Sequence, residues 1–198
     1  MRTAIVLGLV LFLAGCGPAL PAASASPAAG APGQVASAPR ITPPAVTPPT
    51  APGTNLPAFA CADSRAGTVG VANVFDVRVE TQPGYDRFVL QFDTSAPTYT
   101  VKRQAKPVFK SVASGQTITL SGTSGAIVQV HTAGENSTYS GPTDFTHPEF
   151  PVLIEARLID DSKGYVSWGI GLTRPACLRT FTLGDPSRLV VDFATTSS

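Results

Sequence analysis

The chain has 198 residues, of which 43% are hydrophobic and 14% are charged, and its formal net charge at pH 7 is +1. A charge so close to zero gives no sign of the basic surface that binds nucleic acid or acidic lipids. We therefore expect no nucleic acid partner.

The first fifteen residues have the pattern of an export signal. Arg2 supplies a positive charge, and the apolar run from Ala4 to Leu13 is too short to span a bilayer as a helix. The run ends in Leu-Ala-Gly-Cys, which resembles the lipobox of bacterial lipoproteins. We expect residues 1–15 to be removed and the Cys16 thiol to be lipidated, anchoring the chain to the inner or the outer membrane. The alternative is an ordinary secretory peptide with an incidental cysteine.

Residues 16–58 form a linker by composition. The segment is rich in proline and alanine, has no aromatic side chain, and carries one charge, at Arg40. It buries too little apolar area to offset the entropy of ordering, and its prolines favour extended polyproline II. We expect a disordered tether that reaches on the order of 100 Å from the membrane, at about 3.1 Å per residue.

Two cysteines remain beyond the lipidation site, Cys61 and Cys177. An even pair outside the cytosol is expected to form a disulfide. This bond would join the start of the folded domain to its penultimate strand. The alternative is two buried free thiols.

Residues 59–198, the predicted folded domain, show the period-two alternation of β-strands. Phe75, Val77 and Val79 alternate with polar residues, and similar alternation recurs around residues 117–120, 127–131, 154–158 and 167–172. Turn sequences rich in glycine, proline, serine and aspartate separate these stretches, and none of them has helical spacing. The pattern predicts an all-β sandwich or open barrel.

One pattern of an apolar strand occurs twice in the sequence. DRFVLQF begins at Asp86, and PSRLVVDF contains Arg188 and Asp192. Each copy has one wholly apolar face and a second face with polar residues near its ends. We expect the copies either to occupy equivalent places in two related sheets or to pair directly. In an antiparallel pair Arg87 would meet Asp192, and Asp86 and Arg188 are the other candidates for polar pairing.

Six short sequence motifs follow one another between Thr68 and Phe193. They are GYDRFVLQF, TYTV, GQTITLSG with AIVQVHTA, TYSGP, SWGIGL and PSRLVVDF. In this order they resemble the AMIN-like domain of bacterial lipoproteins, which is related to the AMIN modules of cell-wall amidases and secretins. The resemblance implies a non-catalytic β-sandwich of two short antiparallel sheets that binds peptidoglycan or an envelope protein.

Aromatic side chains in and after the long irregular stretch 134–151 are the candidate ligand contacts. Tyr139 lies in this stretch, and Tyr165 and Trp168 follow it. Exposed aromatic rings stack on sugar faces and anchor protein interfaces. The alternative for Trp168 is a place in the core.

No catalytic or metal constellation stands out. His131 and His147 are the only histidines, and the adjacent Asp160 and Asp161 would point to opposite faces of a strand. We expect no enzyme activity, no cofactor and no metal site. The expected function is an extracytoplasmic, membrane-anchored module that binds peptidoglycan or a wall-associated protein. The alternatives are a partner subunit of an envelope complex without glycan affinity, and a small hydrolase that depends on His131 or His147.

Overall fold

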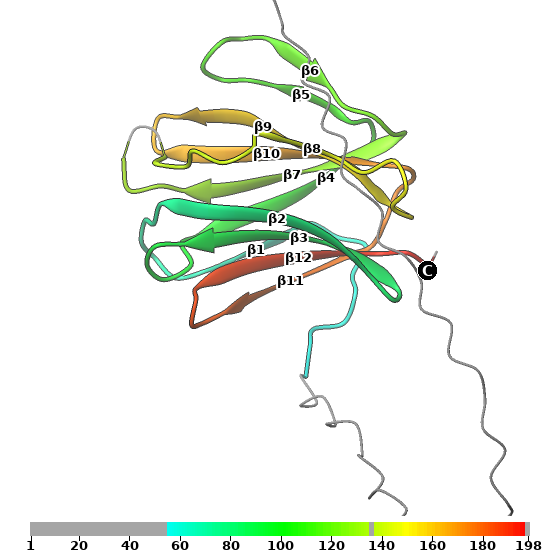
Figure 1. Cartoon of the computed structure of the whole chain (residues 1–198), viewed down its shortest axis with the longest axis horizontal. Coiled ribbons are helices and arrows are strands. Elements are labelled where there is room, and N and C mark those ends of the chain that lie inside the picture. The colour runs from blue at the N-terminus through cyan, green and yellow to red at the C-terminus, as the bar shows by residue number, and fades with distance from the viewer. Residues whose placement is uncertain (1–54, 135–136, 197–198) are drawn as a thin grey trace, which may run out of the picture. The chain divides into compact units, whose positions relative to one another are not determined.

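The computed structural model describes residues 55–134 and 137–196, which form twelve β-strands and no helix (Figure 1). The strands are β1 (Ser64–Ala66), β2 (Val74–Gln82), β3 (Tyr85–Phe92), β4 (Tyr99–Gln104), β5 (Val108–Lys110), β6 (Thr117–Thr119), β7 (Ser124–His131), β8 (Asp144–Thr146), β9 (Leu153–Ser162), β10 (Tyr165–Leu172), β11 (Leu178–Leu183) and β12 (Arg188–Ala194). The predicted all-β fold is confirmed. The predicted signal peptide, Cys16 and the tether up to residue 54 lie outside the described residues.

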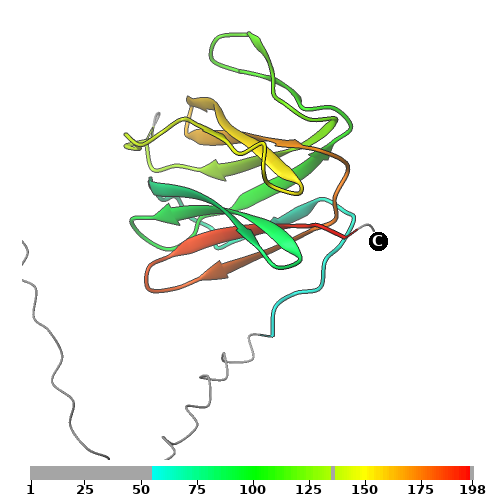
Figure 2. The same cartoon turned by 45° about the vertical axis from the view of Figure 1, so that its right-hand side comes forward.

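Two antiparallel sheets stack face to face (Figures 1 and 2). The larger sheet has the strand order β1-β4-β7-β10-β9-β8, and the smaller has the order β11-β12-β3-β2. Strands β5 and β6 form a separate two-stranded hairpin. Most of the core lies between the two main sheets, so each sheet also has an outer face that is available for other contacts.

The doubled strand forms the centre of the smaller sheet, because β3 and β12 pair directly and antiparallel. Their inner faces carry fully buried apolar side chains, among them Phe88, Leu90, Val191 and Phe193. Direct pairing, one of the two predicted arrangements, is therefore the one that the domain adopts. Its register sets Arg87 opposite Asp192 on the outer face.

A β-bulge at the start of β2 changes which residues face the core. Val74 is the partner of Phe92 and Asp76 is the partner of Gln91, so Phe75 is an extra residue between them. Val74 and Val77 are buried, whereas 69% of the Phe75 surface is exposed. The expectation that Phe75 shares the core face with Val77 is wrong, because the bulge reverses the alternation at this point.

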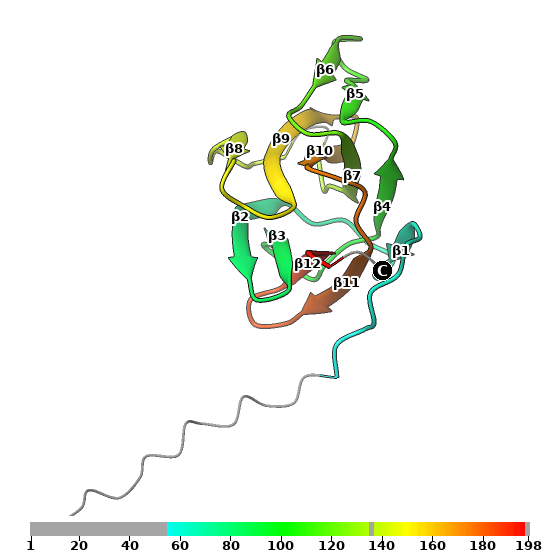
Figure 3. The same cartoon turned by 90° about the vertical axis from the view of Figure 1, so that its right-hand side faces the viewer.

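The hairpin β5–β6 covers one half of the larger sheet's outer face (Figure 3). Phe109 of the hairpin packs against Ile159 of β9 in a small second core. Gly169 of β10 permits this approach, because a Cβ atom there would lie 2.9 Å from the Phe109 ring. The Asp160 carboxylate accepts two backbone N–H bonds from the connection between β5 and β6, at 2.6 and 3.1 Å. The other half of the outer face stays open.

The predicted disulfide between Cys61 and Cys177 is confirmed. It lies next to a β-bridge between Ala60 and Leu178, where the backbone N–H and C=O groups of the two residues bond reciprocally. The bond closes a loop with a sequence separation of 116 residues.

Replacing both cysteines, Cys61→Ser with Cys177→Ser, is expected to lower the free energy of unfolding by about 4–5 kcal/mol, because the open chain regains the entropy of a long loop. Urea denaturation of the wild type and the double variant measures the difference. Equal midpoints for the two proteins, at equal slopes, would contradict this expectation.

Asp86 and Arg188, the other two candidates for polar pairing, find their partners separately and not in each other. The register sets Asp86 opposite Phe193 and Arg188 opposite Gln91, at opposite ends of the strand pair. The Asp86 carboxylate is fully buried and instead accepts the backbone N–H groups of residues 152 and 153, at 2.7 and 2.9 Å. It thereby ties the segment before β9 to the smaller sheet. Arg188 donates to its neighbour, the Pro186 carbonyl, at 3.1 Å.

The substitution Asp86→Asn is expected to cost on the order of 1–3 kcal/mol, because a neutral amide replaces the carboxylate whose one oxygen accepts both backbone N–H groups, and hydrogen bonds to a charged acceptor are the stronger ones. Hydrogen exchange at the backbone amides of Val152 and Leu153 should be faster in this variant than in the wild type. Asp76→Asn is the matched control, since Asp76 pairs with Arg78 at the surface and should change stability by less than about 0.5 kcal/mol. Unchanged exchange at both amides in Asp86→Asn would show that the carboxylate does not hold this segment.

Candidate binding groove on the six-stranded sheet

The outer face of the smaller sheet is occupied by an ion cluster. The Asp192 carboxylate, 0% exposed, accepts bonds from Arg87 at 2.7 and 3.0 Å and from Arg179 at 2.7 Å. The three residues come from neighbouring strands, β3, β12 and β11. The hydrogen bond to Asp192 raises the pKa of Arg87 against the opposing effect of burial. Both arginines are thus committed to one buried carboxylate.

Aromatic rings cover this ion cluster. The Arg179 guanidinium carbon lies 4.5 Å from the Phe59 ring centroid and 4.8 Å from that of Tyr85. The Arg87 guanidinium carbon lies 5.0 Å from the Tyr85 ring and 5.6 Å from the Phe181 ring. Stacking of this kind adds to the charge pairing and keeps water from the carboxylate. The interactions of this face are therefore satisfied within the domain.

The open half of the larger sheet carries a row of polar side chains. Arg65 on β1 is the register partner of Thr100 on β4, which is the partner of Gln129 on β7, which is the partner of Ser167 on β10. The Gln129 side-chain amide donates to the Ser167 hydroxyl at 3.1 Å. The row crosses four strands that are far apart in sequence, and it offers amide, hydroxyl and guanidinium groups side by side.

A tight turn presents the next two groups. Lys163 and Gly164 join β9 to β10 as a two-residue loop in which both residues have positive φ, 55° and 77°. This is the type I′ hairpin geometry, in which glycine is favoured at the second position. The turn places Tyr165 at the first position of β10, directly opposite His131 at the end of β7. The rings of Tyr165 and His131 stack at 4.7 Å with an interplanar angle of 18°.

The stacked pair lies between two shallow depressions that share His131. One has a volume of about 340 Å³ and is lined by Tyr165 and by three members of the polar row, Arg65, Thr100 and Gln129. The other is broader, about 690 Å³, and reaches Val71 and Lys163. We call this surface the His131 groove. It comprises Arg65, Val71, Thr98, Thr100, Gln129, His131, Lys163 and Tyr165.

The His131 groove is basic at both ends. Arg65 lines one depression and Lys163 the other. Within the described residues neither side chain forms an ion pair, in contrast to Arg87 and Arg179 on the opposite sheet. The groove therefore combines an aromatic centre, neutral hydrogen-bonding groups and two available cations.

Of the three aromatic residues that the sequence nominates, the groove contains Tyr165 alone. Trp168 is fully buried and contacts Phe88, Tyr139 and Phe145 at 5.7–6.0 Å between ring centroids. A binding role for Trp168 is wrong, because its alternation places it on the inner face of β10. Tyr139 packs edge-on against Trp168 and donates to the Pro142 carbonyl. Burial, followed by the charge of Asp76, raises the pKa of Tyr139.

Apart from His131, which the sequence offered only as a residue for a hydrolase, sequence reasoning missed the other groove residues. Arg65, Thr100 and Gln129 are ordinary polar positions on strands whose opposite face is apolar. The available signal was the alternation of apolar and polar residues along each strand, which predicts that these three side chains face outward. Their meeting depends on the register of four strands, which no single segment of the sequence reveals.

Both histidines stack on an aromatic ring within the described residues. The His131 ring stacks on Tyr165, and the His147 ring stacks on Phe150 and bonds to Glu149 at 3.0 Å. Across residues 55–134 and 137–196, no group of three His, Cys, Asp or Glu side chains is placed to hold a metal ion. The same residues include no helix able to cross a membrane.

Comparison with known proteins identifies the family. A family model for the AMIN-like domain matches residues 72–195, more than half of the chain. No curated protein and no solved structure matches the chain. The match spans β2 to β12 and so includes the ion cluster strands and most of the His131 groove. The chain therefore belongs to the AMIN-like domain family, whose members are cell-envelope binding modules.

Proposed function

We propose that this protein is a membrane-anchored binding module that holds peptidoglycan in the His131 groove. The observation that supports this proposal is the stacked pair of Tyr165 and His131 beside an open polar row. Tyr165 is 44% exposed, so part of its side chain remains accessible to a ligand. The domain acts by binding and not by catalysis.

The chemistry of the groove suits an amino-sugar chain. The apolar face of a sugar ring stacks on an aromatic ring, and its hydroxyl and acetamido groups bond to side chains such as Thr100 and Gln129. Peptidoglycan also carries carboxylates, which Arg65 and Lys163 attract from either end of the groove. Since both cations are exposed, their contribution falls with rising salt, whereas the stacking contribution does not.

The anchor in this proposal is the lipidated Cys16. Two acyl chains hold a protein stably on a membrane, since each buried methylene contributes about 0.8 kcal/mol. A tether to residue 58 lets the domain work on the order of 100 Å from the lipid surface. Such a reach suits a ligand that lies beyond the membrane, in the cell wall.

A protein partner is the second candidate, and an exposed apolar segment that borders the His131 groove at Val71 favours it. Val69, Val71 and Phe75 are exposed apolar side chains within one short segment, at 103%, 45% and 69%. An apolar strip of this kind is typical of an interaction surface. In that case the domain is a subunit of an envelope complex, and Phe75 rather than Tyr165 carries the affinity.

Tyr165→Ala is expected to weaken binding to purified peptidoglycan sacculi about tenfold, which corresponds to roughly 1.4 kcal/mol of lost stacking. The measurement is co-sedimentation of the chain without its first sixteen residues, across a salt series. Arg65→Gln should reduce binding at low salt and converge with the wild type at high salt, because it removes a screened charge.

Phe75→Ala is the matched control, since Phe75 is an exposed aromatic residue outside the groove, at 69% against 44% for Tyr165. It should pellet with sacculi like the wild type. Since purified sacculi contain no protein partner, binding that survives in Tyr165→Ala and fails in Phe75→Ala would move the peptidoglycan contact out of the His131 groove and onto the segment around Phe75. No pelleting of the wild type above a control protein would overturn the glycan proposal.

A further inference from the structure

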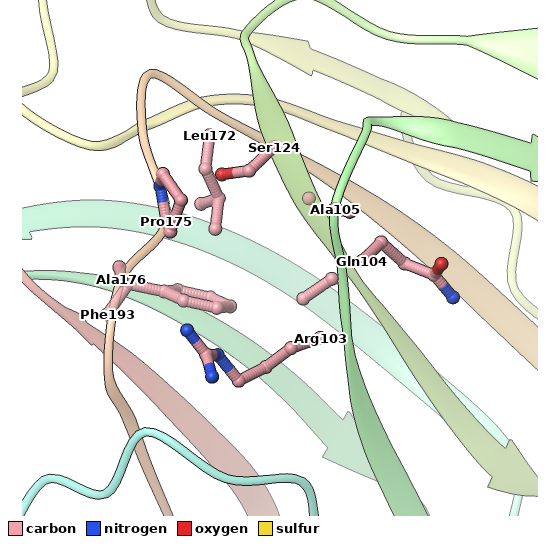
Figure 4. A pocket seen from close by; sticks show the side chains of 10 residues that line it. Arg103, Gln104, Ala105, Ser124, Leu172, Pro175, Ala176 and Phe193 are labelled. Carbon is pink, nitrogen blue, oxygen red and sulfur yellow. The ribbon is translucent and has the colours of Figure 1, made fainter.

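A second pocket opens at one end of the sandwich, and it shares no lining residue with the His131 groove. Its volume is about 190 Å³. It lies between β4, the start of β7 and the connection from β10 to β11, with Phe193 of β12 on its wall (Figure 4). Its lining residues are Arg103, Gln104, Ala105, Ser124, Gly125, Ala126, Leu172, Pro175, Ala176 and Phe193.

Small side chains keep this space open. Four of the ten lining residues are alanine or glycine, and three of these, Gly125, Ala126 and Ala176, are buried. Protein interiors are close-packed, so voids of this size beside a core are uncommon. The volume is below the roughly 300–1,000 Å³ of sites for drug-sized molecules. The pocket therefore suits a group about as large as one amino-acid residue.

Ser124 gives the pocket a buried polar group that the fold does not use. The residue is 2% exposed, and its hydroxyl has no hydrogen-bond partner among the described residues. In Figure 4 the hydroxyl points across the top of the pocket toward Leu172. A buried hydroxyl without a partner destabilises the folded state, and a ligand that bonds to it removes that cost.

Arg103 supplies a cation on the opposite side. Figure 4 shows its guanidinium below the Phe193 ring, away from Ser124. One nitrogen donates to the Cys61 carbonyl at 2.7 Å, and within the described residues Arg103 forms no ion pair. A guanidinium has five N–H donors, so it retains several for a carboxylate.

We propose that this pocket binds the carboxyl-terminal residue of a peptide with a small aliphatic side chain, such as alanine. The carboxylate binds Arg103, the peptide group bonds to the Ser124 hydroxyl, and the methyl group packs against Ala126, Ala176 and Phe193. A fatty acid satisfies Arg103 and the apolar wall but leaves the hydroxyl without a partner. This site is independent of the His131 groove.

The test is a two-dimensional NMR titration of the chain from Gly17 onward with N-acetyl-alanyl-alanine. Binding should shift the amide signals of Gly125, Ala126 and Ala176, with the weak affinity of a fragment-sized ligand, roughly millimolar. The L,L and D,D forms distinguish two sources, because the first marks a protein terminus and the second a peptide of the cell wall. The corresponding dipeptide amide, which lacks the carboxylate, should not bind.

Three variants make the test specific. Arg103→Gln should weaken binding about tenfold, and Ser124→Ala about fivefold without loss of thermal stability, because its hydroxyl has no partner in the folded state. Tyr165→Ala, in the separate groove, should bind the dipeptide like the wild type. The proposal is overturned if neither enantiomer shifts these signals, if Ser124→Ala binds equally well, or if hexanoate competes at the same concentration.

Discussion

Asp192 is the residue on which the arrangement of the smaller sheet depends. Its carboxylate is fully buried on an outer sheet face, where a lone charge would be far too costly. It is tolerated because Arg87 and Arg179 reach it from the two flanking strands. The pairing fixes the register of three strands at once, since a slip by one residue would leave a buried charge without partners. The two similar strands β3 and β12 thus supply both an apolar face to the core and the pair Arg87 and Asp192, which fixes their register.

The same chemistry holds the loops. Buried or half-buried carboxylates on the strands accept backbone N–H groups from connections that would otherwise be loose, as Asp86, Glu155, Asp160 and Asp161 do. Each bond satisfies a donor that a loop cannot satisfy by itself. As a result the hairpin β5–β6 stays over one half of the larger sheet. The other half is left open, and the His131 groove lies there, built on rigid strands.

Alternation in the sequence predicted much of this fold, because it reports which face of a strand is apolar. It identified β3 and β12 and offered their direct pairing, with Arg87 opposite Asp192. It failed at Phe75, where one inserted residue reverses the alternation, a change that depends on the partner strand. It was ambiguous at Trp168, since an aromatic residue at an alternating position is compatible both with the core and with an exposed binding face. The groove and the Ser124 pocket depend on register between distant strands and on small side chains, neither of which leaves a local pattern.

The most direct test of this account is a double-mutant cycle on the ion cluster, with unfolding free energies measured for Arg87→Ala, Asp192→Ala and the double variant. If Asp192 is held by the arginines, the coupling energy should be on the order of 1–3 kcal/mol. The double variant should then be no less stable than Asp192→Ala, in which two guanidiniums face each other without a carboxylate. Additive effects within about 0.5 kcal/mol would contradict the central place that we give to this carboxylate.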